Sequence, residues 1–136
     1  MQLQKYKDKL SGPLLDRIDI KVTVTAVSYE DAQAKKTADA ISSESLKVGV
    51  NKALEMQKIR FGSESKTNSM MSATDVELYC KLTPAAEELL KIAFTKLSMS
   101  MRGYHKTLKV ARTIADIEHA ELIDVKHIQE AIIYKS

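Results

Sequence analysis

An alternation of apolar and polar side chains is the clearest pattern near the start of the chain. From Ile18 to Thr25, four aliphatic residues alternate with aspartate, lysine and threonine residues. This period of two is typical of a β-strand with one buried face. It predicts one strand over residues 18–25, entered through the turn Ser11-Gly12-Pro13. A lone strand cannot complete its own hydrogen-bond ladder, so we expect it to pair with another part of a longer protein or with another chain.

Helical patterns lie on both sides of this predicted strand. Residues 1–10 place Leu3, Tyr6 and Leu10 at spacings of three and four, which predicts a short helix. Residues 29–40 are polar and rich in alanine, and they favour a second helix.

A longer helix is predicted after Ser42 or Ser43, since either serine can cap its start. Its apolar face is expected to consist of Leu46, Val50 and Leu54, and to extend toward residues 56–59. Residues 62–71 are rich in serine and other polar residues, and we expect them to form a mobile polar linker.

Four further helices are predicted from residue 72 onward. Their starts carry N-cap signals: Ser72 with Asp75, Thr83 before Pro84, Ser100 and Asp124. Their apolar positions follow helical spacing, which predicts a small bundle with its own core. The positions expected to face inward are Ala86, Leu89, Leu90, Ala93, Leu97, Leu108, Ala111, Ile114, Ala115, Val125, Ile128, Ala131 and Ile132, with Ile117 as a further candidate.

The composition is that of a soluble globular protein, with 44% hydrophobic and 29% charged residues in a chain of 136. A formal charge of +3 permits contact with nucleotides or nucleic acid without requiring it. No apolar run is long enough to cross a membrane, and the first residues lack the apolar core of a signal peptide. We therefore expect a cytoplasmic protein. The single cysteine, Cys80, lies in an apolar helical context that favours a buried side chain over a reactive thiol.

The chemistry of a free-standing enzyme is missing from this sequence. It contains neither a GxxxxGK[ST] phosphate loop nor a GxGxxG motif, and no nucleophile–base grouping is evident. His105, His119 and His127 have no second ligand type at metal-binding spacing, so we expect ordinary surface or boundary residues and no metal site.

Two arginines each permit two interpretations. Arg17 lies between Asp16 and Asp19, which is most simply a local ion pair at the mouth of the strand. Arg102 shares one helix face with Lys106 and Lys109, at positions i, i+4 and i+7. That stripe is either a solvated surface or a phosphate-facing one, because a helix N-terminus favours anions and arginine offers a bidentate fork.

Two segments resemble the C-terminal part of the magnesium-chelatase-like AAA+ ATPases, and the nearest subgroup is the competence-associated bacterial proteins. They are KYKDKLSGPLLDRIDIKVTV and LSMSMRGYHKTLKVARTIADIEHAELIDVKHIQEAIIY. Within them, SGPLLDRIDI and KVARTIADIE carry the most specific part of the resemblance. The sequence ISSES before the predicted long helix is similar to an ESS motif of the family.

The resemblance implies a mainly α fold. An AAA+ lid-type helical domain of about four helices would follow a helix and one strand left from a truncated α/β ATPase core. Residues 1–27 would then be the end of the core, residues 28–71 a helical connection that includes the linker, and residues 72–136 the lid.

The resemblance also implies roles for the two arginines. Arg17 resembles the arginine finger, the catalytic residue that reaches the γ-phosphate of ATP bound on a neighbouring subunit. Arg102, in Ser100-Met101-Arg102, resembles sensor 2, which contacts nucleotide phosphate and couples the lid to the nucleotide. Lys106 and Lys109 lie on the same face, but the resemblance gives them no role.

In such proteins the cofactors are ATP and magnesium, and the partners are the upstream ATPase core, neighbouring subunits of a homo-oligomeric, hexameric ring, and DNA. The phosphate loop, the magnesium-binding acids and sensor 1 would lie upstream of residue 1. We therefore expect this chain alone to bind no cofactor and to be inactive, as a fragment of a branch-migration or remodelling motor.

A second hypothesis is a stand-alone helical module that binds a protein or nucleic acid through the basic stripe. The modest charge and the lack of a clear helix-turn-helix register count against it.

Overall fold

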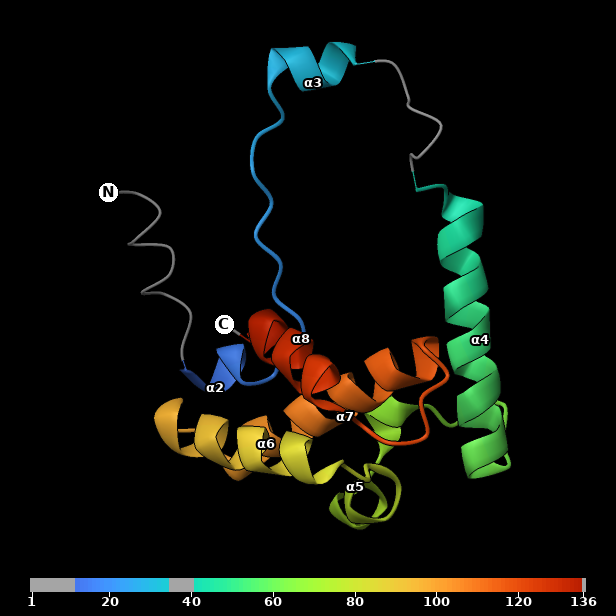
Figure 1. The fold of residues 1–136 in the computed structure, drawn as a ribbon, viewed down its shortest axis with the longest axis vertical. Helices are drawn as coiled ribbons and strands as arrows, with labels where there is room; N and C mark the ends of the chain where they lie inside the picture. The colour runs from blue at the N-terminus through green and yellow to red at the C-terminus, as the bar shows by residue number, and fades with distance from the viewer. Residues whose placement is uncertain (1–11, 35–40, 136) are drawn as a thin grey trace.

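The computed structural model describes residues 12–34 and 41–135, and helices account for nearly all of its regular structure (Figure 1). This confirms the predicted mainly α fold. The elements are α2 (Gly12–Leu15), α3 (Tyr29–Gln33), α4 (Ser43–Phe61), the 3₁₀ turn η1 (Asn68–Met70), α5 (Ala73–Tyr79), α6 (Pro84–Lys96), α7 (Met101–Ile117) and α8 (Val125–Lys135).

The helices begin where side chains replace the missing backbone partners of the first turn. At α5, Ser72 accepts the N–H of Asp75 while the Asp75 carboxylate accepts the N–H of Ser72, which completes a capping box. Thr83 caps α6 and Ser100 caps α7 in the predicted manner. These local predictions are confirmed because a cap depends only on residues within one turn of it.

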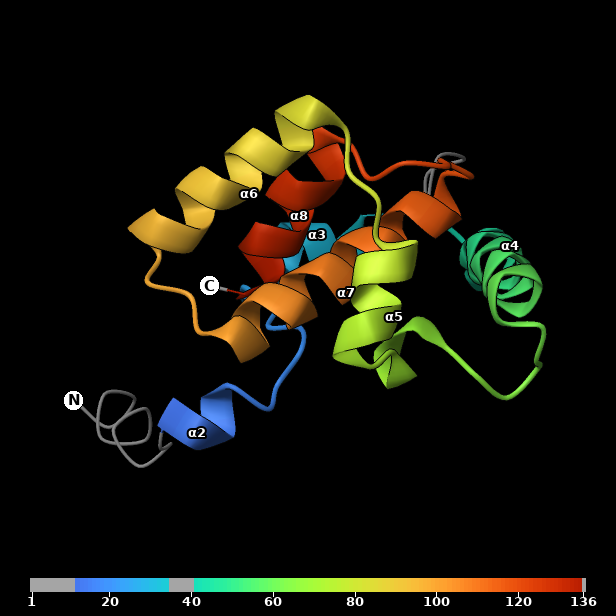
Figure 2. The same ribbon diagram turned by 90° about the horizontal axis from the view of Figure 1, so that it is seen from below.

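Helix α7 is the centre of the bundle. It packs against α8, α4 and α5, while α6 packs against α8 (Figure 2). The core side chains include Ala111 and Ala115 of α7 and Ile128 of α8, all fully buried. A parallel bridge between Leu82 and Ile123 joins the connection before α6 to the connection before α8. The predicted four-helix array after residue 72 is therefore present.

The predicted strand at residues 18–25 is wrong for this structure, in which the described residues of that region form extended chain without a ladder. Ile20, Val22 and Val24 are 52%, 68% and 85% exposed. The N–H of Lys21 donates to the carbonyl of Tyr134 at 2.8 Å, which ties only the start of the segment to α8. No strand lies beside the segment within residues 12–34 and 41–135, so its alternating pattern buries no face.

The face of α4 that packs against the bundle also differs from the prediction. Leu46, Val50 and Leu54 are about half exposed, whereas Ala53 and Gln57 are buried. Gly49 and Arg60 share the face of Ala53 and Gln57, because all four are separated by three or four residues. Small and polar side chains make this contact, so hydrophobicity alone did not reveal it. Leu97 at the end of α6 and Ile117 at the end of α7 are likewise exposed instead of inward-facing.

The segment predicted as a mobile polar linker is held at several points. Gly62 ends α4 in the left-handed conformation at φ 62°, which glycine adopts without strain. Asn68 is 2% exposed, and its backbone N–H donates to the Gln57 side chain at 2.8 Å. The expectation of mobility is therefore wrong at Asn68.

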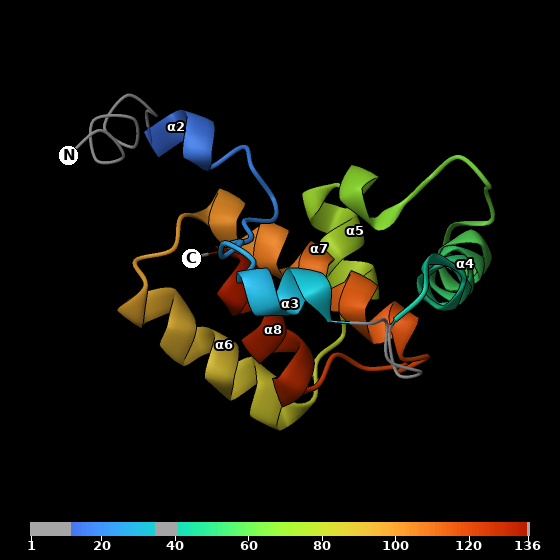
Figure 3. The ribbon, with the colours of Figure 1, turned by 90° about the horizontal axis from the view of Figure 1, so that it is seen from above.

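Helix α3 lies away from the bundle, at the end of the extended segment that follows α2 (Figure 1), and the view from above looks past α3 onto the bundle (Figure 3). It covers only the first part of the helix predicted over residues 29–40, and the helix predicted over residues 1–10 lies outside the described residues. Among the described helices, none has the length and apolar character required to span a membrane.

Candidate functional site

Arg17 lies in the turn that follows α2. Its backbone N–H donates to the carbonyl of Leu14 at 3.0 Å, and the N–H of Asp16 donates to that of Gly12 at 2.9 Å, so the turn continues the geometry of the short helix. The Arg17 side chain is exposed and forms no ion pair with Asp16, Asp19 or any other acid in the described part of the chain. The simpler interpretation of Arg17 as a local ion pair is therefore wrong.

Lys106 of α7 holds the turn on both sides of Arg17. Its Nζ donates to the carbonyl oxygens of Asp16 and Ile18, the latter at 2.8 Å, and lies 3.1 Å from the carboxylate of Asp19. The Lys106 side chain is only 17% exposed. Together with the backbone contact between Lys21 and α8, this places the turn of residues 16–19 against the bundle.

Arg102 lies in the first turn of α7, two residues after the N-cap Ser100 and one turn before Lys106. Its side chain is exposed and has no charged partner among the described residues. The unpaired N–H groups and the dipole of the helix start add a positive potential at this end of α7. The structure thus brings the Arg17 turn to the helix that carries Arg102.

The predicted basic stripe is not a row of free cations. Lys106 is committed to the Arg17 turn, and Lys109 Nζ donates to the carbonyl of Ser69 at 3.2 Å. Of the three stripe residues, Arg102 is the one whose side chain forms no hydrogen bond or ion pair within the described residues.

A buried ionic cluster, which the sequence analysis did not identify, joins α4 to α7. The carboxylate of Asp116, fully buried, accepts from Arg60 Nη2 at 2.5 Å and Nη1 at 2.8 Å, from Asn68 Nδ2 at 2.8 Å and from Arg112 Nε at 3.1 Å. The pKa of the Arg112 guanidinium is lowered, chiefly by burial. The adjacent Asp116 carboxylate offsets part of this effect. Asn68 Nδ2 also donates to Thr113 Oγ1 at 3.1 Å.

This cluster explains part of the KVARTIADIE motif in structural terms. Arg112 and Asp116 are its charged residues at i and i+4, on the same face as the buried Leu108 and Ala115. A charged pair on an apolar helix face is the sequence signal that could have identified the site. Arg60 could not be found in this way, since it lies 56 residues from Asp116.

His127 is 1% exposed, so its predicted surface or boundary position is wrong. Its Nδ1 accepts the N–H of Asp124 at 2.9 Å, and its Nε2 lies 3.2 Å from the carboxylate of Glu118. The ring therefore helps to fix the start of α8. Within the part of the chain that the structure describes, no three histidine, cysteine, aspartate or glutamate residues are grouped to hold a metal.

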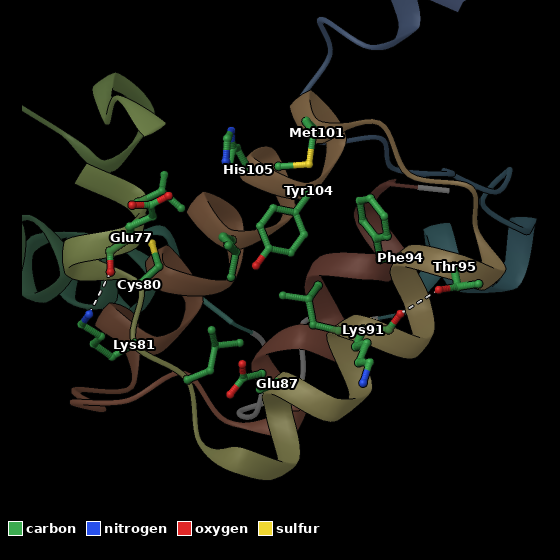
Figure 4. Close-up of a pocket in the computed structure, with 14 residues that line it drawn as sticks. Glu77, Cys80, Lys81, Glu87, Lys91, Phe94, Thr95, Met101, Tyr104 and His105 are labelled. Carbon is green, nitrogen blue, oxygen red and sulfur yellow. Dashed lines mark hydrogen bonds between the residues drawn. The ribbon is translucent and has the colours of Figure 1, made fainter. Parts of the chain in front are cut away.

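An open groove of about 750 Å³ lies between α5, α6 and α7 (Figure 4). Phe94, Met101 and Tyr104 line it together with Cys80. Burial raises the pKa of the Cys80 thiol to about 11, so this thiol is protonated near neutral pH and is a poor nucleophile. The buried position predicted for Cys80 is confirmed.

Comparison with known proteins agrees with the fold. The family model described as "Magnesium chelatase, subunit ChlI C-terminal" matches residues 40–135, and "Magnesium chelatase, subunit ChlI" matches residues 1–32. The chain therefore belongs to the magnesium-chelatase-like family, and its helical bundle is the C-terminal lid-type domain.

Individual relatives place the chain near the competence-associated members. It is 32% identical over 135 residues to Competence protein ComM of Haemophilus influenzae. It is 33% identical over 135 residues to Uncharacterized protein YifB of Escherichia coli, and 32% identical over 115 residues to an uncharacterized protein of Mycobacterium bovis. These alignments cover 99%, 99% and 84% of this chain but 26%, 26% and 22% of the relatives. The chain thus spans about a quarter of the length of these curated relatives.

Proposed function

We propose that this chain is the lid-side part of a ring-forming AAA+ ATPase that remodels DNA, with Arg17 as arginine finger and Arg102 as sensor 2. The observation that carries the proposal is the juxtaposition of two exposed guanidinium groups with one helix. Arg17 lies in a turn fixed to α7 by Lys106, and Arg102 lies at the start of α7 itself. Membership in the magnesium-chelatase-like family supports this proposal.

The position of Arg17 suits a residue that acts on a neighbouring molecule. A finger must extend from a fixed backbone, with its charge not neutralised by its own subunit, so that it can stabilise charge on a transferred phosphoryl group. Arg17 meets both requirements in the described part of the chain: its turn is held on both sides and its guanidinium has no acidic partner. In nucleotide hydrolases such a finger contributes about 10³–10⁵ in rate.

The position of Arg102 suits contact with phosphate. Arginine offers a planar fork for two phosphate oxygens, and the start of a helix adds oriented N–H groups. ATP would be held chiefly by an ATPase core, with Arg17 and Arg102 reaching its phosphates. The grouped acids that magnesium requires are not found among the described residues, so the core would supply them.

DNA as the remodelled partner is supported by the likeness to a protein named for competence, not by a surface of this chain. A stand-alone nucleic-acid module is less well supported, because Lys106 and Lys109 use their ammonium groups inside the molecule.

The experiment is a comparison of ATP hydrolysis and ATP binding in the full-length gene product. Arg17→Ala should lower kcat by at least about 10³-fold with ATP affinity largely retained, since the finger acts on transition-state charge. Arg17→Lys should not restore turnover, because lysine lacks the planar fork. Wild-type turnover in Arg17→Ala would remove Arg17 from the mechanism.

Arg102→Ala should weaken nucleotide affinity, hydrolysis or both, since sensor 2 contacts phosphate. Lys47→Ala removes an exposed cation on α4, far along the chain from both arginines, and serves as the charge-matched control. Unchanged affinity and hydrolysis in Arg102→Ala would contradict the sensor assignment.

A further inference from the structure

The ammonium group of Lys106 has three N–H donors, and it meets three acceptors from a single turn of the chain. Two are the carbonyl oxygens of Asp16 and Ile18, which flank Arg17 in sequence, and the third is the carboxylate of Asp19. Lysine donates hydrogen bonds and accepts none, and the two hydrogen bonds and the ion pair of Lys106 all go to this one turn. The acceptors surround Arg17 without including it, so the contact fixes its backbone and leaves its side chain free.

Among the described residues, no other side chain of the bundle forms a hydrogen bond or ion pair with residues 16–19. The nearest additional polar tie is the backbone contact of Lys21 with Tyr134, beyond the turn. Lys109, three residues further along α7, donates to Ser69 on a different part of the molecule. Lys106 is therefore distinguished from its neighbour by its partners and not by its charge.

The placement of Lys106 on α7 links the Arg17 turn to Arg102. Residues 102 and 106 are one turn apart on a continuous helix, with a rise of about 6 Å between them. A helix transmits a rigid shift along its axis, since its backbone hydrogen bonds are unbroken. Any displacement of the start of α7 is thus passed to the carbonyl groups on either side of Arg17.

We propose that Lys106 is a positioning residue: it sets the place of Arg17 from α7, so that the helix that carries Arg102 also orients the group offered to a neighbouring subunit. This inference rests on the function proposed above and adds to it a residue with no phosphate contact of its own. The observation that carries it is that two hydrogen bonds and one ion pair join the Lys106 side chain to the turn that contains Arg17.

The first test needs only this chain and does not depend on catalysis. Clostripain, which cleaves after arginine, reports how readily the Arg17 turn opens. Lys106→Met keeps an unbranched side chain one atom shorter and removes its charge and donors. We expect cleavage after Arg17, followed by mass spectrometry, to be faster by at least about tenfold, the factor that corresponds to loss of one hydrogen bond to a charged group. Lys109→Met is the matched control and should cleave as the wild type does.

Circular dichroism of both variants distinguishes local opening of the Arg17 turn from unfolding of the bundle. The Lys106→Met protein should retain the helical spectrum and the unfolding midpoint of the Lys109→Met protein, since the bundle core is untouched. Equal cleavage rates in the two folded variants would show that Lys106 does not hold the Arg17 turn.

The second test uses ATP turnover by the full-length gene product. Lys106→Met should lower kcat by about 10–100-fold with little change in KM for ATP, because the finger is misplaced while nucleotide contacts are retained. The double variant Arg17→Ala/Lys106→Met should be no slower than Arg17→Ala alone, since Lys106 acts through Arg17. An additional loss in the double variant would overturn that role.

The two proposals fail in different ways. If Arg17→Ala turns over ATP normally while Lys106→Met still opens the turn, the finger role of Arg17 is wrong. The claim that Lys106 holds the turn is then retained. If Arg17→Ala is inactive while Lys106→Met has wild-type kcat, the finger is retained and the positioning role is wrong.

Discussion

The fully buried carboxylate of Asp116 offers the sharpest test of what holds α4 to the bundle. Replacing it with alanine removes the acceptor for Arg60, Asn68 and Arg112 in one step. Arg60, at 11% exposure, lies near the surface and can turn toward water. Arg112, at 1% exposure, cannot, and it keeps only the carbonyl oxygens of the α7–α8 connection as partners.

The expected loss of folding free energy follows from this difference in exposure between Arg60 and Arg112. Removing one member of a buried ion pair typically costs about 3–5 kcal/mol, because the remaining charge is left in a poorly solvated site. A domain of this size is stable by about 5–15 kcal/mol, so Asp116→Ala should remove at least about a fifth of its free energy of unfolding. The melting temperature should fall by about 10–20 °C. Arg60→Ala should cost less, about 1–3 kcal/mol, since Asp116 keeps Arg112 and Asn68.

Urea unfolding followed by far-UV circular dichroism measures these differences. Glu64→Ala is the control, because it breaks the exposed Lys58–Glu64 pair on the same helix end, and surface pairs contribute little. The expected order of destabilisation is Asp116→Ala, then Arg60→Ala, then Glu64→Ala. If Asp116→Ala unfolds within about 1 kcal/mol of the wild type, the account of a buried charge that depends on its partner is refuted.

Two further predictions concern titration. The pKa values of Asp75, Glu118 and Asp124 lie below their ordinary values, chiefly through hydrogen bonds from the Ser72 backbone, Lys126 and the Val125 backbone, respectively. Their stabilisation is therefore present above the unfolded-state values of 3.8 to 4.5 and is lost as the pH falls below them, so the urea midpoint should drop from about pH 5 downward. A midpoint that rose between pH 5 and pH 3 would contradict this. Separately, Cys80 should react with iodoacetamide at pH 8 about 100-fold more slowly than a cysteine with the ordinary pKa of 9.0, given its own pKa of about 11. Equal rates, measured by mass spectrometry in native buffer, would show the thiol to be accessible and ionised.

The parts of this fold that could be predicted from sequence are those determined within one helical turn. The caps at Ser72, Thr83 and Ser100 are confirmed, as is the bundle that follows them, because caps and amphipathic spacing are local properties. The strand at residues 18–25 failed for the opposite reason. Alternation shows that a segment suits a sheet, but whether a sheet forms depends on a partner strand elsewhere.

The same distinction between local and long-range properties applies to the candidate site. Arg17 and Arg102 were selected by resemblance, and their roles remain proposals. That Lys106 holds the turn of Arg17 could not be inferred, since their contact spans about 90 positions of sequence and depends on backbone carbonyl groups that carry no residue-specific signal. The Asp116 cluster was missed because Arg60 lies outside the apolar face predicted for its helix, and Asn68 lies in the segment expected to be a mobile linker.

The contacts of Arg112 have a consequence for the evolution of the chain. Connections between helices usually tolerate insertions, because they lie on the surface and little depends on their length. Between α7 and α8, however, the two ends of one buried guanidinium reach the successive carbonyl groups of Ala120 and Glu121, and Ile123 is fully buried two residues later. One added residue would move those carbonyl groups out of register with the guanidinium or displace Ile123 from the core. In this family member, length variation should therefore be tolerated less between residues 118 and 123 than in the surface segment around residues 63–65.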